Sequence, residues 1–236
     1  MTTNNPISIQ ASKYYIDACF LLTLTQPNDK RHQTVIDFIQ ETGNRNITYA
    51  ISNHVYTEVY NNIFKFIIKR ALSTFLKYQR KIHAKHGKID FLTDKEKDFL
   101  IELEAVQYLN KVASHNFDYY NRKPENLFIQ DLIKVAKLNA NKVQLLDCFY
   151  NKAKDLYDGI ILIIESQGVN FSHLNSSEND LQNAINYQLH YQLDSSDSLH
   201  LAIAINNGCD KFVTLDGDFN HPTLALNVPL VIDKIA

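Results

Sequence analysis

Four acidic residues are the side chains of this sequence best suited to chemistry: Asp17, Glu58, Asp197 and Asp216. Asp17 interrupts an apolar run, where a carboxylate is costly to bury unless it is paired, bound to a cation or placed at a strand tip. Carboxylates that converge from distant segments repel one another and raise one another's pKa, so such a group needs a cation. Oxygen ligands with few histidines suit Mg²⁺ or Mn²⁺ better than Zn²⁺. We therefore expect a Mg²⁺ or Mn²⁺ site.

Each acid alone also has a simpler interpretation. Glu58 or Asp197 would ordinarily be a solvated helix residue or a favourable charge at a helix N-terminus. Only their occurrence together, in comparable places along the chain, favours a shared site.

Charge and cysteine content exclude several other classes. The 236 residues include 24 basic and 26 acidic ones, so a nucleic-acid or anionic-membrane partner would have to meet a local basic patch. The three cysteines are scattered, which argues against a zinc cage and against a secreted disulfide framework. Neither a signal peptide nor a membrane span is expected, and a cytoplasmic location is predicted.

Motif spacing excludes further kinds of site. The six glycines form neither a dinucleotide-binding motif nor a P-loop. The nine histidines form no H-x-H or H-E-x-x-H pair, which argues against metalloprotease and histidine-rich zinc sites. The chemistry is therefore expected to depend mainly on carboxylates.

Alternating strands and helices are expected to position the four acids. Apolar runs predict strands over residues 14–24, 47–51, 169–174, 211–215 and 228–232. Helical spacing predicts helices over residues 32–41, 181–193 and 197–207, and a further helix after the second strand. The helix after the second strand is expected to begin at a cap at Ser52 or Asn53, and the helix over 197–207 at a cap at Ser195 or Ser196. This alternation predicts an α/β fold with a central parallel sheet and helices on both faces. Because ligands gather at the carboxyl ends of parallel strands, the acids are expected to meet there.

Residues 65–157 differ from the rest of the chain. They are charged and helical in pattern, with Gly87 and Pro124 as the main breakers. We interpret them as a helical insertion within a single domain that spans residues 12–236.

Four stretches of the sequence resemble the successive motifs of PIN-domain nucleases. They are YIDACFLL around Asp17, SNHVYTE ending at Glu58, DSLHLAIA beginning at Asp197, and FVTLDGDF around Asp216. Their order and mutual spacing also match those of the family. The resemblance covers roughly residues 14–64 and 158–233, and its two C-terminal motifs together are the more specific part.

The resemblance implies a Rossmann-like PIN fold, a divalent-metal site and hydrolysis of phosphodiester bonds, commonly of RNA. Many members are toxins of toxin–antitoxin pairs, so a protein inhibitor is one partner to expect, and a homo-oligomer remains open. The resemblance implies catalytic and metal-binding roles for Asp17, Glu58, Asp197 and Asp216. Asp218 and Asp194 could assist the site, and we include Asp218 among the metal ligands.

Two features depart from the family pattern. Ala18 stands where many relatives carry a hydroxyl residue directly after the first Asp. Compact toxin-type members lack the insertion over residues 65–157. Thr214 and Ser196 could hydrogen-bond the carboxylates, although a Thr in a strand and a Ser before a helix are more often a good strand former and a cap.

The insertion begins with a basic stretch. No acid occurs between Val59 and Ile89, and the stretch carries Lys65, Lys69, Arg70, Lys77, Arg80, Lys81, Lys85 and Lys88. Lys77, Arg80 and Lys81 are predicted to bind the substrate through the phosphate backbone of RNA. A merely solvated helix face is the alternative.

A binding module is the second functional hypothesis. In that case the insertion docks a protein through Phe99, Leu103, Val106 and Leu109, although core packing is the more frequent use of such spacing. A phosphatase is discounted, because aspartyl-phosphate chemistry needs a D-x-D after the first strand and Asp17 is followed there by Ala18 and Cys19.

Overall fold

Two compact units make up the computed structural model, which describes residues 12–45, 47–100, 102–118, 120, 124–219, 224 and 227–235. The first unit contains the residues up to Val59 and from Asp158 onward, and the second runs from Tyr60 to Tyr157. The segments that resemble PIN-domain motifs lie in the first unit.

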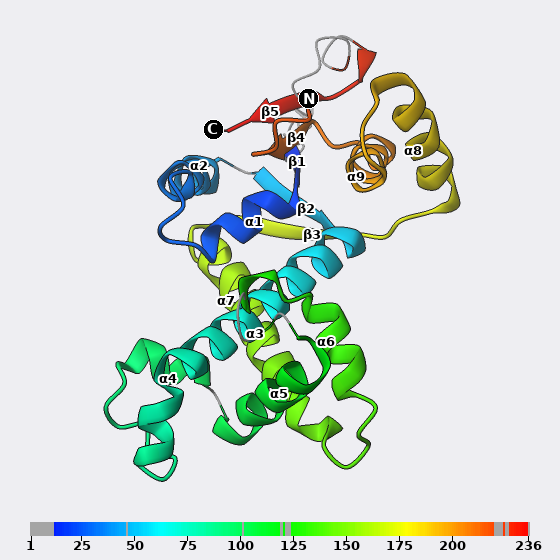
Figure 1. Ribbon diagram of the computed structural model, residues 1–236. Helices are drawn as coiled ribbons and strands as arrows, with labels where there is room; N and C mark the ends of the chain where they lie inside the picture. The colour runs from blue at the N-terminus through cyan, green and yellow to red at the C-terminus, as the bar shows by residue number, and fades with distance from the viewer. Residues whose placement is uncertain are drawn as a thin grey trace, which may run out of the picture. The chain divides into compact units, whose positions relative to one another are not determined.

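A five-stranded, all-parallel sheet forms the centre of the first unit (Figure 1). The strand order is β3-β2-β1-β4-β5. The strands are β1 (Ser12–Ile16), β2 (Ile47–Ser52), β3 (Asn170–Leu174), β4 (Lys211–Thr214) and β5 (Val231–Lys234). The predicted parallel α/β architecture is confirmed. β2 and β3 lie on one side of β1, and β4 and β5 lie on its other side. β1 and β4 therefore flank the topological switch point, where ligands bind in such sheets.

Helices flank this sheet. α1 (Ala18–Leu24) and α2 (His32–Gly43) connect β1 to β2, and α8 (Glu178–Tyr191) and α9 (Ser195–Asn206) connect β3 to β4. The two connections run in opposite directions across the sheet, so right-handed crossovers place their helices on opposite faces, as Figure 1 shows. The central strands are apolar on both faces: Ile16, Ile51, Phe212 and Val213 are fully buried.

The predicted strand over residues 14–24 is wrong in its second half. The strand ends at Ile16, and residues 18–24 form α1. The Asp17 side chain accepts a hydrogen bond from the backbone N–H of Ala18 and so caps the helix. An acid that looked like an interruption of a strand therefore lies at the strand tip.

Two further boundaries differ from prediction. The last strand was expected over residues 228–232 and lies at Val231–Lys234, because Pro229 has no N–H for the ladder with β4. The cap of α9 is Asp194, whose carboxylate accepts from the N–H of Asp197, and not Ser195 or Ser196. Ser52 does cap α3, since its hydroxyl oxygen accepts from the N–H of Val55.

The second unit is built of helices. Its elements are the continuation of α3 (Asn53–Ala84), α4 (Asp94–Leu100), α5 (Leu103–Asn116), the 3₁₀ turns η1 (Pro124–Asn126) and η2 (Val143–Leu146), α6 (Ile129–Ala136) and most of α7 (Asp147–Ser166). Val106 and Leu109 are fully buried, so they are core residues and cannot belong to an exposed docking face.

Within the described ranges, no helix has both the length and the apolar character needed to cross a membrane.

Candidate metal centre

Asp17 occupies the tip of β1, beside β4, and only 5% of it is exposed. Its backbone N–H donates to the carbonyl of Val213. One carboxylate oxygen accepts from Ala18, and the other accepts from the Thr214 hydroxyl at 2.8 Å and the Cys19 thiol at 2.9 Å. Three donors thus stabilise and orient a nearly buried carboxylate. The predicted contact between Thr214 and a site carboxylate is confirmed.

The Cys19 thiol acts here as a hydrogen-bond donor. Burial and the neighbouring Asp17 carboxylate raise its pKa well above the usual range. The thiol therefore stays protonated, and it is unsuited to act as a nucleophile.

Three further carboxylates converge beyond β4 and at the start of α9. Ligand oxygens of Asp197, Asp216 and Asp218 lie within 4.8 Å of one another. Asp216 lies two residues after the end of β4, and its backbone N–H donates to the Thr214 hydroxyl, while the N–H of Asp218 donates to the Asp216 carboxylate. Asp197 lies in the first turn of α9. We call Asp197, Asp216 and Asp218 the carboxylate group.

Burial and the repulsion of nearby carboxylates disfavour the ionised form of Asp197. Burial, together with the charges of Asp194, Asp17 and Asp216, raises the pKa of Asp197 to about 7. Asp17 is therefore close enough to act on the carboxylate group although it is held by other partners. A divalent cation would offset this repulsion, and an all-oxygen donor set suits Mg²⁺ or Mn²⁺.

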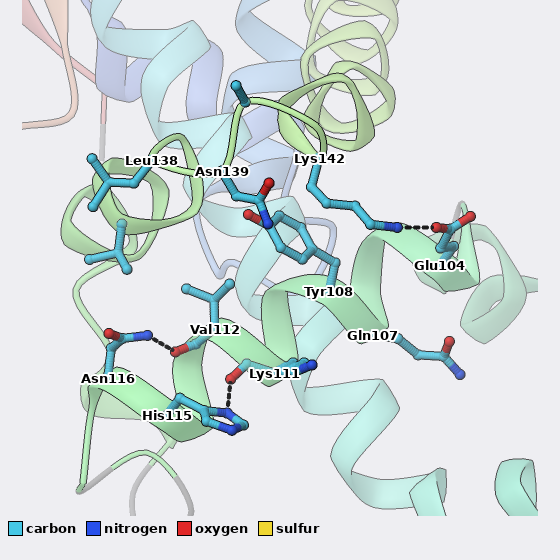
Figure 2. A pocket seen from close by; sticks show the side chains of 12 residues that line it. Glu104, Gln107, Tyr108, Lys111, Val112, His115, Asn116, Leu138, Asn139 and Lys142 are labelled. Atoms are coloured by element: carbon cyan, nitrogen blue, oxygen red, sulfur yellow. Dashed lines mark hydrogen bonds and ion pairs between the residues drawn. The ribbon is translucent and has the colours of Figure 1, made fainter.

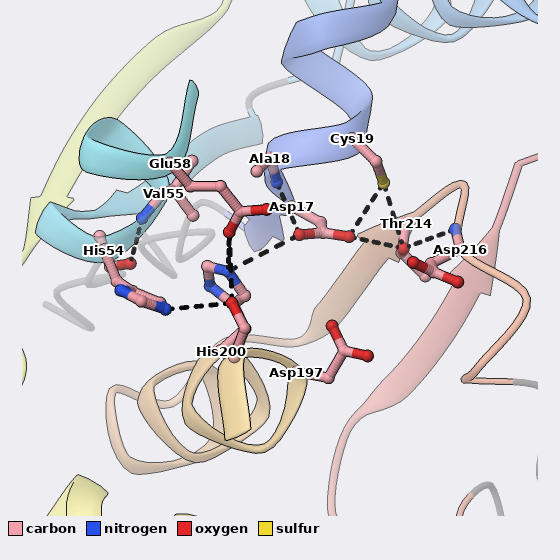
Figure 3. A network of polar contacts seen from close by, with 12 residues as sticks. Asp17, Ala18, Cys19, His54, Val55, Glu58, Asp197, His200, Thr214 and Asp216 are labelled. Atoms are coloured by element: carbon pink, nitrogen blue, oxygen red, sulfur yellow. Dashed lines mark hydrogen bonds and ion pairs between the residues drawn. The ribbon is translucent and has the colours of Figure 1, made fainter. Parts of the chain in front are cut away.

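Glu58 lies in different surroundings from the other predicted acids. Its carboxylate accepts from His200 Nε2 at 3.1 Å and from the Ser196 hydroxyl at 3.3 Å. The hydrogen bond from His200 lowers the pKa of Glu58, which stays ionised. The predicted contact between Ser196 and a site carboxylate is confirmed. Figure 3 shows Glu58 with two histidines on one side of Asp17, and Thr214 and Asp216 on the other.

His54 and His200 are site residues that the sequence interpretation missed. His200 is 1% exposed, its Nε2 is 3.9 Å from Asp17 as well as close to Glu58, and its ring centroid is 4.7 Å from that of His54. The spacing of these histidines from acidic residues in the sequence could have indicated both. His54 precedes Glu58 by four residues, and His200 follows Asp197 by three, so each histidine shares a helix face with an acid.

A chain of buried hydroxyls supports His200. Its Nδ1 is 2.8 Å from the Tyr15 hydroxyl, which is 2.7 Å from the Ser52 hydroxyl. Burial raises the pKa of Tyr15 well above its usual range, so the phenol stays neutral and keeps its proton for hydrogen bonding. β1, β2 and α9 are thereby joined at the site.

The predicted substrate-binding cations belong to the second unit. Lys77 forms a 3.3 Å ion pair with Glu96, and the Lys81 ammonium lies 4.3 Å from the centre of the Phe91 ring. Arg80 is exposed. Part of this positive charge is therefore engaged by residues around α4.

A groove of about 750 Å³ also lies in the second unit, lined by residues of α5, α6 and the segment after α6 (Figure 2). Lys142 and Glu104 form a 2.8 Å ion pair at its edge, and the Tyr108 hydroxyl donates to the carbonyl of Ala136. Both groups of metal-ligating side chains found among the described residues lie in the first unit and not in this groove.

Comparison with protein-family models, with curated proteins and with solved structures finds no match for this chain.

Proposed function

We propose that the protein is a divalent-metal-dependent endoribonuclease of the PIN type, which hydrolyses phosphodiester bonds of RNA. The observation that supports it most is the convergence of Asp197, Asp216 and Asp218 within 4.8 Å, next to Asp17 at the switch point of a parallel sheet. These acids come from the segments that resemble PIN-domain motifs, and the choice of RNA follows from that resemblance.

The donor set fits Mg²⁺ or Mn²⁺. Asp197, Asp216 and Asp218 would hold the cation, and Asp17 would adjoin it. A bound cation would activate water for attack at phosphorus and neutralise charge on the phosphate oxygens. Thr214 and Cys19 orient the Asp17 carboxylate, and His200 and Ser196 orient that of Glu58. Such prior orientation lowers the reorganisation needed when substrate binds.

Cleavage assays with the purified full chain test this proposal. Labelled single-stranded and structured RNAs are incubated with Mg²⁺ or Mn²⁺, with EDTA, and with EDTA followed by excess metal. We expect cleavage that EDTA abolishes and metal restores. Asp17→Asn and Asp197→Asn should each abolish cleavage while the circular dichroism spectrum stays unchanged, because the amide keeps the volume and removes the charge. Cleavage indifferent to EDTA and to both substitutions would disprove the proposal.

A protein-binding function is the second candidate, and an apolar row on α8 favours it. Leu181, Ile185 and Leu189 are four residues apart and are 51%, 50% and 75% exposed. This row, rather than the buried Val106 and Leu109, is an apolar surface that a protein inhibitor or another partner could cover. Metal-dependent cleavage by the full chain would separate the two functions.

A further inference from the structure

His54, Glu58 and His200 form a second group of metal-ligating side chains, separate from the carboxylate group. One ligand atom of each lies within 4.8 Å of the others. His54 and Glu58 lie in the first two turns of α3, and His200 lies in α9. Figure 3 shows the three side chains facing one another. We call them the histidine group.

The donor atoms suit a different cation from that of the carboxylate group. Two imidazoles and one carboxylate are typical ligands of Zn²⁺, whereas Mg²⁺ prefers oxygen ligands and binds imidazole poorly. Bonds of 2.0–2.1 Å in a tetrahedral zinc site place ligand atoms about 3.3 Å apart. His200 Nε2 and Glu58 are 3.1 Å apart. The pair therefore needs little movement to admit the ion between its atoms.

His54 can complete the group by a small rearrangement. Its Nε2 lies 3.1 Å from the Ser196 hydroxyl, and that hydroxyl also donates to Glu58 at 3.3 Å. Ser196 thus bridges His54 and Glu58. A cation on the three ligands would replace the hydrogen bonds that now connect them.

The surroundings of His200 resemble the support that zinc-binding histidines require. Such a histidine is normally held through its other ring nitrogen. Here the Tyr15 hydroxyl lies 2.8 Å from Nδ1, which directs Nε2 towards Glu58. With Nε2 on a metal, Nδ1–H can donate to Tyr15 and the phenol can donate to Ser52. The Ser52 oxygen already accepts from the N–H of Val55 and has a second lone pair available for this bond.

We propose that His54, Glu58 and His200 bind one Zn²⁺ per chain, independently of the carboxylate group. The proposal concerns binding and does not rest on the nuclease function, so a chain without nuclease activity would bind zinc equally well.

Zinc titration of the metal-free full chain tests this site. Binding is measured against a chromophoric zinc chelator with Mg²⁺ in large excess, and Co²⁺ is added separately to record the visible spectrum of a tetrahedral site. We expect one Zn²⁺ per chain, and at least a tenfold weaker affinity in His54→Gln and in Glu58→Gln. His173→Gln removes an exposed histidine of β3 and should leave the affinity unchanged.

The double variant Asp197→Asn, Asp216→Asn separates the two groups. We expect it to bind Zn²⁺ as the unsubstituted chain does. Melting curves of all metal-free variants verify that they fold. If folded His54→Gln and Glu58→Gln retain full zinc affinity, or if the double variant loses it, zinc does not bind at the histidine group and the proposal is wrong.

Discussion

At the scale of single residues, Asp17 belongs to the fold and to the site at once. Its carboxylate caps α1, and its remaining partners, Thr214 and Cys19, hold it beside the acids that follow β4. The same charge contributes to the raised pKa of Asp197. A local capping interaction thus sets the position of a charge that the whole site experiences.

Asp197→Asn should make the metal-free protein more stable. The pKa of Asp197 is raised to about 7 in the folded protein, against about 3.9 for an unperturbed Asp, so ionising it in the fold costs free energy. For an acid with a raised folded pKa, the stabilising contribution is lost as pH rises between these two values. The melting temperature of the variant should therefore exceed that of the unsubstituted chain by more at pH 8 than at pH 4.

Melting curves in EDTA across this pH range provide the measurement. Asp155→Asn, at an exposed position of α7, makes the same chemical change and should shift the melting temperature little at any pH. A melting temperature of Asp197→Asn that equals or falls below that of the unsubstituted chain at pH 8 would contradict the electrostatic interpretation.

At the scale of elements, the end of α2 depends on a glycine. A Cβ on Gly43 would lie 1.9 Å from the carbonyl oxygen of Gln167, in the turn that Gly168 makes with φ +85° after α7. Gly43→Ala should therefore shift backbone and destabilise the chain by about 1–3 kcal/mol, as overpacking does. The measurement is urea-induced unfolding.

Gly159→Ala is the matched control for this substitution. Gly159 lies inside α7, and a Cβ there would contact nothing within 4 Å. Alanine is favoured over glycine in a helix interior by about 1 kcal/mol, so this variant should be more stable. The two Gly-to-Ala changes should thus have opposite signs, and equal effects would contradict the close contact at Gly43.

The basic stretch of α3 supports a prediction about RNA binding. Lys77 already pairs with Glu96, so the sharper test reverses the exposed Arg80 and Lys81 to Glu. If both contact phosphates, the slope of log affinity against log salt should fall by about 0.7 for each lost contact with single-stranded RNA. Affinity is measured across a salt series in an Asp17→Asn background, which prevents cleavage.

Reversal of Lys95 and Lys134 to Glu serves as the control, since both are exposed lysines of the same unit outside the basic stretch. This variant carries the same change in net charge. If the two double variants have equal slopes, residues 80 and 81 contribute only general charge, and a solvated helix face becomes the better interpretation.

At the scale of the whole molecule, metal binding should stabilise the fold. A ligand that binds only the folded state at 100 times its Kd contributes about 2.7 kcal/mol. For a chain of this length, 1 kcal/mol corresponds to about 2–4 °C in melting temperature. Saturating Mn²⁺ should therefore raise the melting temperature by about 5–10 °C.

The same measurement on Asp197→Asn provides the control. This variant loses one ligand of the carboxylate group and should show a much smaller rise with Mn²⁺. An equal rise in both proteins would place the stabilising metal elsewhere in the chain.

Local sequence determined much of this architecture. Apolar runs and capping residues sufficed to predict α2, β2 and β4 to within two residues at each end, because strand and helix periodicities depend on neighbouring residues. The parallel α/β class followed from their alternation. The importance of Asp17 was also evident, since an acid in an apolar run has a high cost wherever the run is buried.

Tertiary structure decided which side chains share a site. It placed Asp197 and Asp216 with Asp218, and it directed Glu58 to His54 and His200, although no H-x-H or H-E-x-x-H motif marks these histidines. The hydrogen bond of His200 with Glu58 and its contact with Tyr15 join segments that are far apart in the chain. Such contacts depend on strand order and helix rotation, which spacing within one segment cannot specify. The boundary between β1 and α1 has a different, local cause: Asp17 caps α1 through the N–H of Ala18, while the apolar pattern runs on from the strand into the helix without a break.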